Sequence, residues 1–192
     1  MLTPIHKRDL AASAWMRENQ IDLATIFLKC LTATAYAGTW GAVVLGIFAL
    51  NYYGVLPEWN RLLERTLRAM VAPGFAWVVI MTMKRLWPRE RPFTQFENPE
   101  NRNAPSRPSG KVGPRTNDSF PSGHAASSFA FFAASLFVLG AKVPTGFLIG
   151  VGLWASLVSF SRFYLGVHYL SDVLVGIVVG YSLGAAVGFF FR

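Results

Sequence analysis

Hydrophobic positions along the chain fall into long runs that contain no charged residue. These runs extend from Cys30 to Pro57, Ala69 to Met83, Ala125 to Ala141, Val143 to Ser161 and Val173 to Phe191. A helix needs about 20 apolar residues to cross a bilayer, and ~17–25 is usual. The second run is short, but its helix can extend towards the N-terminus if Arg65 and Arg68 snorkel to the interface. The pattern predicts helices at 31–53, 62–86, 121–141, 144–162 and 168–191.

The fold class that follows is an all-α, polytopic transmembrane helix bundle forming one domain over residues 1–192. Apolar residues make up 53% of the chain, and their concentration in span-length runs disfavours a soluble all-α core. Residues 1–30 mix charged and apolar side chains, which indicates an amphipathic helix that is interfacial or partly inserted. A separate span over 21–36 would be too short, and Lys29 interrupts it. The prediction is therefore five spans plus this N-terminal helix.

The segment 87–120 is predicted to be a polar loop, because Pro, Asn, Ser, Gly and Arg dominate its composition. Structureless loops of this length are uncommon in compact domains and are usually functional or disordered. Its basic residues could face anionic lipid headgroups. Arg89 and Arg115, with Arg85 just before the loop, are interpreted as interfacial anchors.

Glycines recur at every fourth position of the last apolar run, at Gly176, Gly180, Gly184 and Gly188. Such a smooth stripe allows close approach of another helix backbone. Packing against a neighbouring helix of the same chain is favoured over a dimer seam, and a monomer is favoured accordingly.

Three polar clusters lie at the ends of the predicted helices. They are KRLWPRERP at 84–92, FPSGH at 120–124 and SRFYLGVHYLSD at 161–172. In an up-and-down bundle, the end of the second helix, the start of the third, the end of the fourth and the start of the fifth share one side of the membrane. Counting the spans therefore predicts that all three clusters meet at one bilayer face.

The cations of these clusters indicate an anion site. Lys84, Arg91 and Arg162 supply positive charge, and the two guanidinium groups match the oxygens of a phosphate. A helix is expected to open after Asp118 or Ser119, where free backbone amides would add to the site. Ser122 could donate a hydroxyl hydrogen bond there.

Two histidines and one carboxylate complete the predicted site. His168 and Asp172 are four residues apart, a spacing that lets the carboxylate hold the imidazole. With His124, the set suits metal-free phosphoryl transfer, in which one histidine attacks phosphorus and the other protonates the leaving oxygen. A metal site is disfavoured because only two His and one Asp would lie beside repelling cations. Alone, His168 and Asp172 could equally form a structural ion pair.

These residues resemble the signature of the type 2 phosphatidic-acid phosphatase superfamily. The matches are K-x6-R-P from Lys84 to Pro92, P-S-G-H from Pro121 to His124, and S-R-x5-H-x3-D from Ser161 to Asp172. The resemblance implies a nucleophilic His168 that becomes a phosphohistidine, oriented by Asp172, and a His124 that protonates the leaving alcohol and then activates water. It assigns phosphate binding to Lys84, Arg91, Ser122, Gly123 and Arg162. Members usually have six transmembrane helices, one more than the pattern predicts here.

The predicted function is therefore hydrolysis of a membrane lipid phosphate without cofactor or metal. Phosphatidic acid, phosphatidylglycerol phosphate and a lipid A phosphate are the candidate substrates. Undecaprenyl diphosphate is an alternative, which Gly123 disfavours because relatives with that substrate often carry an acidic residue there. Vanadium-dependent haloperoxidases share the signature but are larger and soluble. A non-enzymatic protein that binds or transports anionic lipids is the alternative of another class.

The bilayer and the lipid substrate are the expected partners, with no nucleic acid. The expected location is the inner, cytoplasmic membrane. Resemblance puts the site on its periplasmic or outer face, whereas positive residues normally mark cytoplasmic loops. The outer face is preferred because several of the basic residues concerned are assigned to the site and the 87–120 loop is long.

Overall fold

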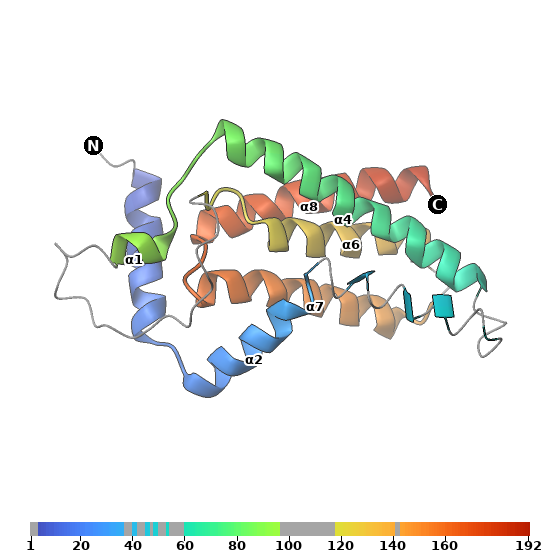
Figure 1. Cartoon of the computed structure of the whole chain (residues 1–192), viewed down its shortest axis with the longest axis horizontal. Helices are drawn as coiled ribbons and strands as arrows, with labels where there is room; N and C mark the ends of the chain where they lie inside the picture. The colour runs from blue at the N-terminus through green and yellow to red at the C-terminus, as the bar shows by residue number, and fades with distance from the viewer. Residues whose placement is uncertain are drawn as a thin grey trace.

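The computed structural model is all-helical over the residues that it describes, which are 4–36, 40–41, 45–46, 48–49, 53, 60–96, 118–140 and 143–192. Its helices are α1 (Pro4–Glu18), α2 (Asp22–Ala33), α4 (Asn60–Leu86), α5 (Pro92–Phe96), α6 (Gly123–Val138), α7 (Thr145–Tyr164) and α8 (Leu170–Phe190). Helices α4, α6, α7 and α8 run side by side as a bundle (Figure 1). The predicted all-α helix bundle is confirmed.

Three helices of the described chain are long and apolar enough to cross a membrane. They are Leu63–Leu86, Thr145–Tyr164 and Leu170–Phe190, while Gly123–Val138 is a shorter apolar helix. The extension of the second predicted span beyond its charge-free run is confirmed, since that helix reaches back past Arg68 and Arg65. The chain is a membrane protein, but the predicted count of five spans is not confirmed.

The predicted first span, 31–53, lies largely outside the described residues. Helix α2 already begins at Asp22 and ends at Ala33, and residues 34–36 form a turn, so a helix beginning at 31 is wrong. The described residues at 40–41, 45–46 and 48–49 are helical.

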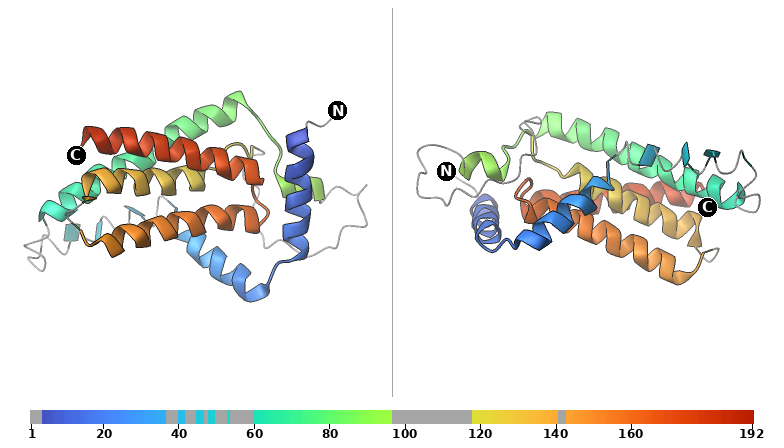
Figure 2. Two further views of the ribbon diagram at one scale, coloured as in Figure 1. Left: turned by 180° about the vertical axis from the view of Figure 1, so that it is seen from behind. Right: turned by 60° about the horizontal axis from the view of Figure 1, so that its bottom comes forward.

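The N-terminal segment forms two helices rather than the single one predicted. Between α1 and α2, Tyr164 of α7 fixes the connection: Gln20 Nε2 donates to its carbonyl at 2.5 Å and the Ile21 amide donates to its hydroxyl at 2.7 Å. Helix α1 crosses the end of the bundle at a steep angle to the four bundle helices (Figures 1 and 2). It exposes Ile5 and Trp15, as expected of a helix lying in the membrane interface.

Helices α6 and α8 meet along the glycine stripe. A Cβ added to Gly180 would lie 2.1 Å from the carbonyl oxygen of Ala126, and one on Gly184 would lie 2.2 Å from that of Ala130. Only glycine allows the backbones to come so close. The prediction that the stripe packs within the chain is confirmed.

Prolines mark the polar ends of the bundle helices. Helix α4 ends at Leu86, two residues before Pro88, and α5 begins at Pro92 inside the predicted 87–120 loop. Helix α6 begins at Gly123 with Ser122 as its N-cap, later than the opening expected after Asp118 or Ser119. Most of the remaining loop, 97–117, lies outside the described residues.

Candidate active site

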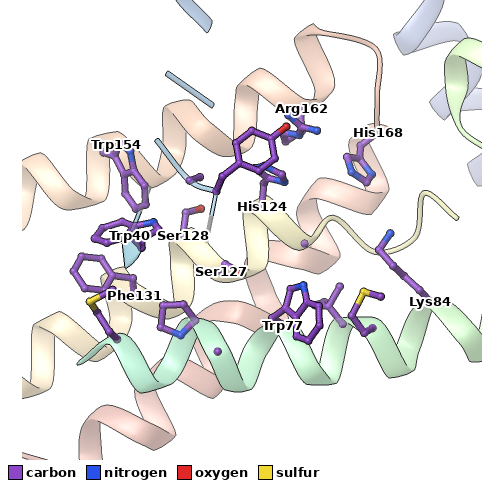
Figure 3. Close-up of a pocket in the computed structure, with 18 of the residues that line it drawn as sticks. Trp40, Trp77, Lys84, His124, Ser127, Ser128, Phe131, Trp154, Arg162 and His168 are labelled. Atoms are coloured by element: carbon purple, nitrogen blue, oxygen red, sulfur yellow. The ribbon is translucent and has the colours of Figure 1, made fainter. Parts of the chain in front are cut away.

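A cavity of about 670 Å³ opens between α4, α6 and α7, and the predicted site residues gather at one end of it (Figure 3). Its lining includes Lys84, Arg91, Gly123, His124, Arg162 and His168. These residues come from all three polar clusters, so the predicted convergence of the clusters is confirmed.

The opposite end of the cavity is apolar. Trp40, Phe131 and Trp154 lie there, away from Lys84 and His168, and Trp77 of α4 lies between the two ends (Figure 3). Pro73 and Gly74 of α4 also line the cavity, and neither offers a long side chain to fill it. One space therefore joins a cationic end to an aromatic and aliphatic end.

Hydrogen bonds to uncharged oxygens orient the three cations. Lys84 Nζ donates to the Asp118 carbonyl at 2.6 Å, and Arg91 Nη1 donates to the Val167 carbonyl at 3.2 Å. Arg162 Nη1 donates to the Thr32 hydroxyl at 3.0 Å. These bonds fix the orientation of three positively charged side chains that line one cavity, which suits the binding of an anion.

The start of α6 reaches the cavity through Gly123 and His124. Among the residues that the structure describes, a Cβ on Gly123 would meet Ile80 Cγ2 alone, at 3.8 Å, so close packing against them does not require glycine here. The ring of Tyr36 packs edge-on against His124 at 4.9 Å between ring centroids. This contact limits the orientations available to the imidazole.

Ser122 and Asp172 are not among the described residues that line the cavity. The Ser122 amide donates to the Asp172 carbonyl at 3.0 Å, so it ties the start of α6 to the first turn of α8. The Ser122 hydroxyl is buried, with no hydrogen-bond partner within the described part of the chain. The structure thus gives Ser122 a backbone contact rather than a hydroxyl directed into the cavity.

Asp172 is fully buried and faces His168. Its Oδ2 lies 3.7 Å from His168 Nδ1 and accepts a hydrogen bond from the Tyr169 amide at 3.0 Å. His168 itself precedes α8, and its amide donates to the Arg162 carbonyl at 3.2 Å. The predicted pairing of His168 with Asp172 is present, although His168 lies before the helix rather than on its face.

Burial lowers the pKa of His168 to about 4, and the positive charges of Arg162, Arg91 and Lys84 act in the same direction against Asp172. His168 is therefore a neutral imidazole near pH 7. A neutral imidazole keeps a lone pair on one nitrogen, which is the requirement for a nucleophile.

The interpretation of Arg89 as an interfacial anchor is wrong. Its side chain is only 20% exposed, and Arg89 Nη1 donates to Asp172 Oδ1 at 2.6 Å. Its Nη2 donates to Asp9 Oδ2 of α1 at 2.8 Å. Asp9 is not among the predicted site residues, because its position within a charged, amphipathic stretch gives no indication that it has a buried partner.

No group of three or more His, Cys, Asp or Glu side chains suited to a metal ion occurs in the described ranges. The expectation that the reaction needs no metal stays a prediction.

The model of the PAP2 superfamily, the family of type 2 phosphatidic-acid phosphatases, matches residues 65–191, which is more than half of the chain. The chain belongs to the PAP2 superfamily. The three signature segments lie inside the matched region, and the resemblance found in the sequence is confirmed.

One curated relative is a lipid A 4'-phosphatase from Bacteroides thetaiotaomicron, 38% identical over 61 residues. That match covers 32% of this chain and 26% of the relative, so the chain aligns with about a quarter of the relative's length.

Two solved structures share the fold. The transmembrane PAP2 type phosphatidylglycerolphosphate phosphatase from Bacillus subtilis has a TM-score of 0.74 and 21% identity, over 98% of this chain and 87% of that one. The LpxE protein from Aquifex aeolicus has a TM-score of 0.68 and 20% identity, over 93% of each chain. The structural similarity covers nearly the whole of this chain, including the helices outside the three signature segments.

Proposed function

We propose that the protein is a metal-independent phosphatase that removes a phosphate from a membrane lipid through a phosphohistidine intermediate. The observation that carries this proposal is the single cavity that joins a cationic end bearing two histidines to an apolar end lined by tryptophans. A phosphate at the cationic end would leave its hydrocarbon chain beside Trp77, Trp40 and Trp154. Membership in a family with lipid phosphatase relatives supports the same reaction class.

His168 is the proposed nucleophile. Because Asp172 faces Nδ1 of its ring, the opposite nitrogen, Nε2, is the one that attacks phosphorus. The new N–P bond forms as the P–O bond to the lipid breaks, and the departing oxygen takes a proton from His124. His168 becomes cationic in this step, and the adjacent carboxylate of Asp172 stabilises that charge.

The second half-reaction uses the same residues in reverse. His124 accepts a proton from water, whose oxygen attacks the phosphohistidine, and breakage of the N–P bond releases inorganic phosphate. Lys84, Arg91 and Arg162 hold the three peripheral phosphate oxygens and offset the charge that they carry in both steps. The amides at the start of α6 add donors at Gly123, while Ser122 contributes by fixing the start of α6 to Asp172.

The proposed substrates are phosphatidylglycerol phosphate and a lipid A phosphate, after which two of the similar proteins are named, with phosphatidic acid as the third candidate. The test is phosphate release by the purified protein in detergent with EDTA, from these lipids and from undecaprenyl diphosphate. We expect EDTA-resistant turnover with a clear preference for one monophosphate. Preference for the diphosphate would change the substrate class. Loss of activity in EDTA would refute the metal-free mechanism, and binding without turnover of any lipid would favour a non-enzymatic role.

The proposed location is the inner membrane, with the cavity mouth on the periplasmic or outer face. A cysteine placed within 95–115, in a chain whose exposed Cys30 has been replaced, should react with an impermeant thiol reagent added to intact cells. Reaction only after the cells are opened would put the site on the cytoplasmic face.

A further inference from the structure

Arg89 connects the buried carboxylate of Asp172 to the N-terminal helix. One guanidinium nitrogen, Nη1, donates to Asp172 Oδ1 at 2.6 Å and to Ser171 Oγ at 2.8 Å. The other, Nη2, donates to Asp9 Oδ2 at 2.8 Å and lies 3.2 Å from His6 Nδ1. The guanidinium also lies over the ring of Tyr169, 4.0 Å from its centroid. Arg89 is therefore held from several sides in one orientation.

Asp9 makes a second connection, to the start of α8. Its Oδ1 accepts from the Ser171 amide at 3.1 Å, and its Oδ2 accepts from the Ser171 hydroxyl at 2.5 Å. The Ser171 amide belongs to the first turn of α8, where a helix lacks intrahelical acceptors for its N–H groups. A carboxylate from α1 thus caps the helix that carries Asp172, and it does so from a buried position.

These contacts leave Asp172 with its two oxygens committed to different neighbours. Oδ1 is held by Arg89, and Oδ2 is left on the side of the Tyr169 amide and His168 Nδ1. Rotation of the carboxylate would break the bond to Arg89, so Arg89 fixes which oxygen His168 meets.

We propose that Asp9 is a positioning residue for the phosphatase reaction: from helix α1, it holds Arg89 and the start of α8 so that Asp172 Oδ2 stays facing His168 Nδ1, 3.7 Å away. This inference rests on the proposed function and extends it to a helix outside the family signature. Asp172 then retains the ring proton on Nδ1 and leaves Nε2 bare for attack on phosphorus.

Charge balance gives Asp9 a second effect on the same group. Asp9 offsets part of the positive charge of Arg89. The attraction between Arg89 and Asp172 is therefore weaker, and more of the negative charge of Asp172 acts on His168. His168 becomes cationic when its N–P bond forms, and a carboxylate less occupied by Arg89 stabilises that cation better. Lys84, Arg91 and Arg162 also act on His168 and oppose its positive charge, which makes the contribution of Asp172 more important.

The kinetic test compares Asp9→Asn with Glu18→Gln, which removes the same charge from an exposed position of the same helix. We expect kcat of Asp9→Asn to fall on the order of 10- to 100-fold, as small displacements of catalytic groups do, with KM unchanged. Glu18→Gln should keep both values. Arg89→Lys keeps the charge but lacks the planar fork whose two nitrogens meet Asp172 and Asp9 separately, so it should resemble Asp9→Asn and replaces it if Asp9→Asn does not fold. Wild-type kcat in these variants, or a loss confined to KM, would overturn the proposal.

A second readout needs no turnover. The chain has three histidines, so ¹⁵N NMR of labelled imidazoles at pH 7 can follow His168 once its signals are assigned by substitution. In the wild type the proton should reside on Nδ1, and in Asp9→Asn the share on Nε2 should rise. An unchanged tautomer would refute the positioning role. If the wild type hydrolysed no lipid phosphate, the proposed function would fail while this measurement still decided the role of Asp9.

Discussion

Helices α6 and α8 meet in two regions built on opposite principles. Along most of their length, Gly180 and Gly184 pack against Ala126 and Ala130 with backbone almost touching backbone. At the polar end, a hydrogen bond from the Ser122 amide to the Asp172 carbonyl joins the same helices, and Arg89, from outside the pair, holds the Asp172 carboxylate. The glycine seam contains no ionisable group and sets the distance between the helices, whereas the polar end carries the groups proposed for chemistry.

Close packing and the proposed chemistry are therefore separated along one pair of helices. Two backbones in close contact cannot accommodate an added atom, because there are no long side chains between them that could change rotamer to make room. The arrangement of the polar end depends on the positions of particular hydrogen-bonding atoms rather than on the volume of the side chains. Changes at the seam should therefore alter stability first, and changes at the polar end should alter turnover first.

The largest expected effect is a loss of turnover without a loss of stability, caused by a substitution at the polar end. His168→Ala removes the proposed nucleophile, and turnover of the lipid substrate should fall at least about 10⁴-fold. The melting temperature in detergent should stay near the wild-type value, since the seam is untouched. Phosphate release and thermal unfolding measured on the same preparation check both statements. Residual turnover within tenfold of wild type would remove His168 from the mechanism.

The seam is broken by Gly180→Ala. The added methyl would overlap the carbonyl of Ala126, so the helices must separate, and we expect a loss of about 3 kcal/mol or more in stability. Thermal unfolding in detergent measures it, with activity expressed per folded molecule. The matched control is Gly150→Ala in α7, where an added Cβ meets no atom of the described residues within 4 Å and stability should hold or rise slightly. Equal melting temperatures for the two variants would contradict the close packing of the seam.

The two regions also differ in how far the sequence predicts them. The seam and the helices α4, α6, α7 and α8 could be predicted because long apolar runs and a four-residue glycine period are local patterns. The signature residues were found because their types and spacings are unusual in apolar surroundings. The interpretation of Arg89 was wrong because arginines near helix ends are commonly interfacial anchors, and because its partner Asp9 is 80 residues away in the sequence. The division of the N-terminal segment into α1 and α2 depends on Tyr164, a contact that no local pattern records.

The smallest expected effect is a pH dependence that belongs to the polar end alone. The pKa of His168 is lowered by burial to about 4, below its ordinary value of about 6.5, so the unfolded chain binds more protons than the folded one between these pH values. The contribution of His168 to the free energy of unfolding is fully present above pH 6.5 and is lost as the pH falls towards 4. The loss amounts to about 2 kcal/mol between pH 7 and pH 5.

His168→Gln should lose less stability than the wild type over that interval, as measured by thermal unfolding at both pH values. Gly180→Ala should keep the full wild-type pH dependence on its lowered baseline, since no titrating group lies in the seam. Identical losses in wild type and His168→Gln would show that His168 is not a neutral, buried imidazole at pH 7.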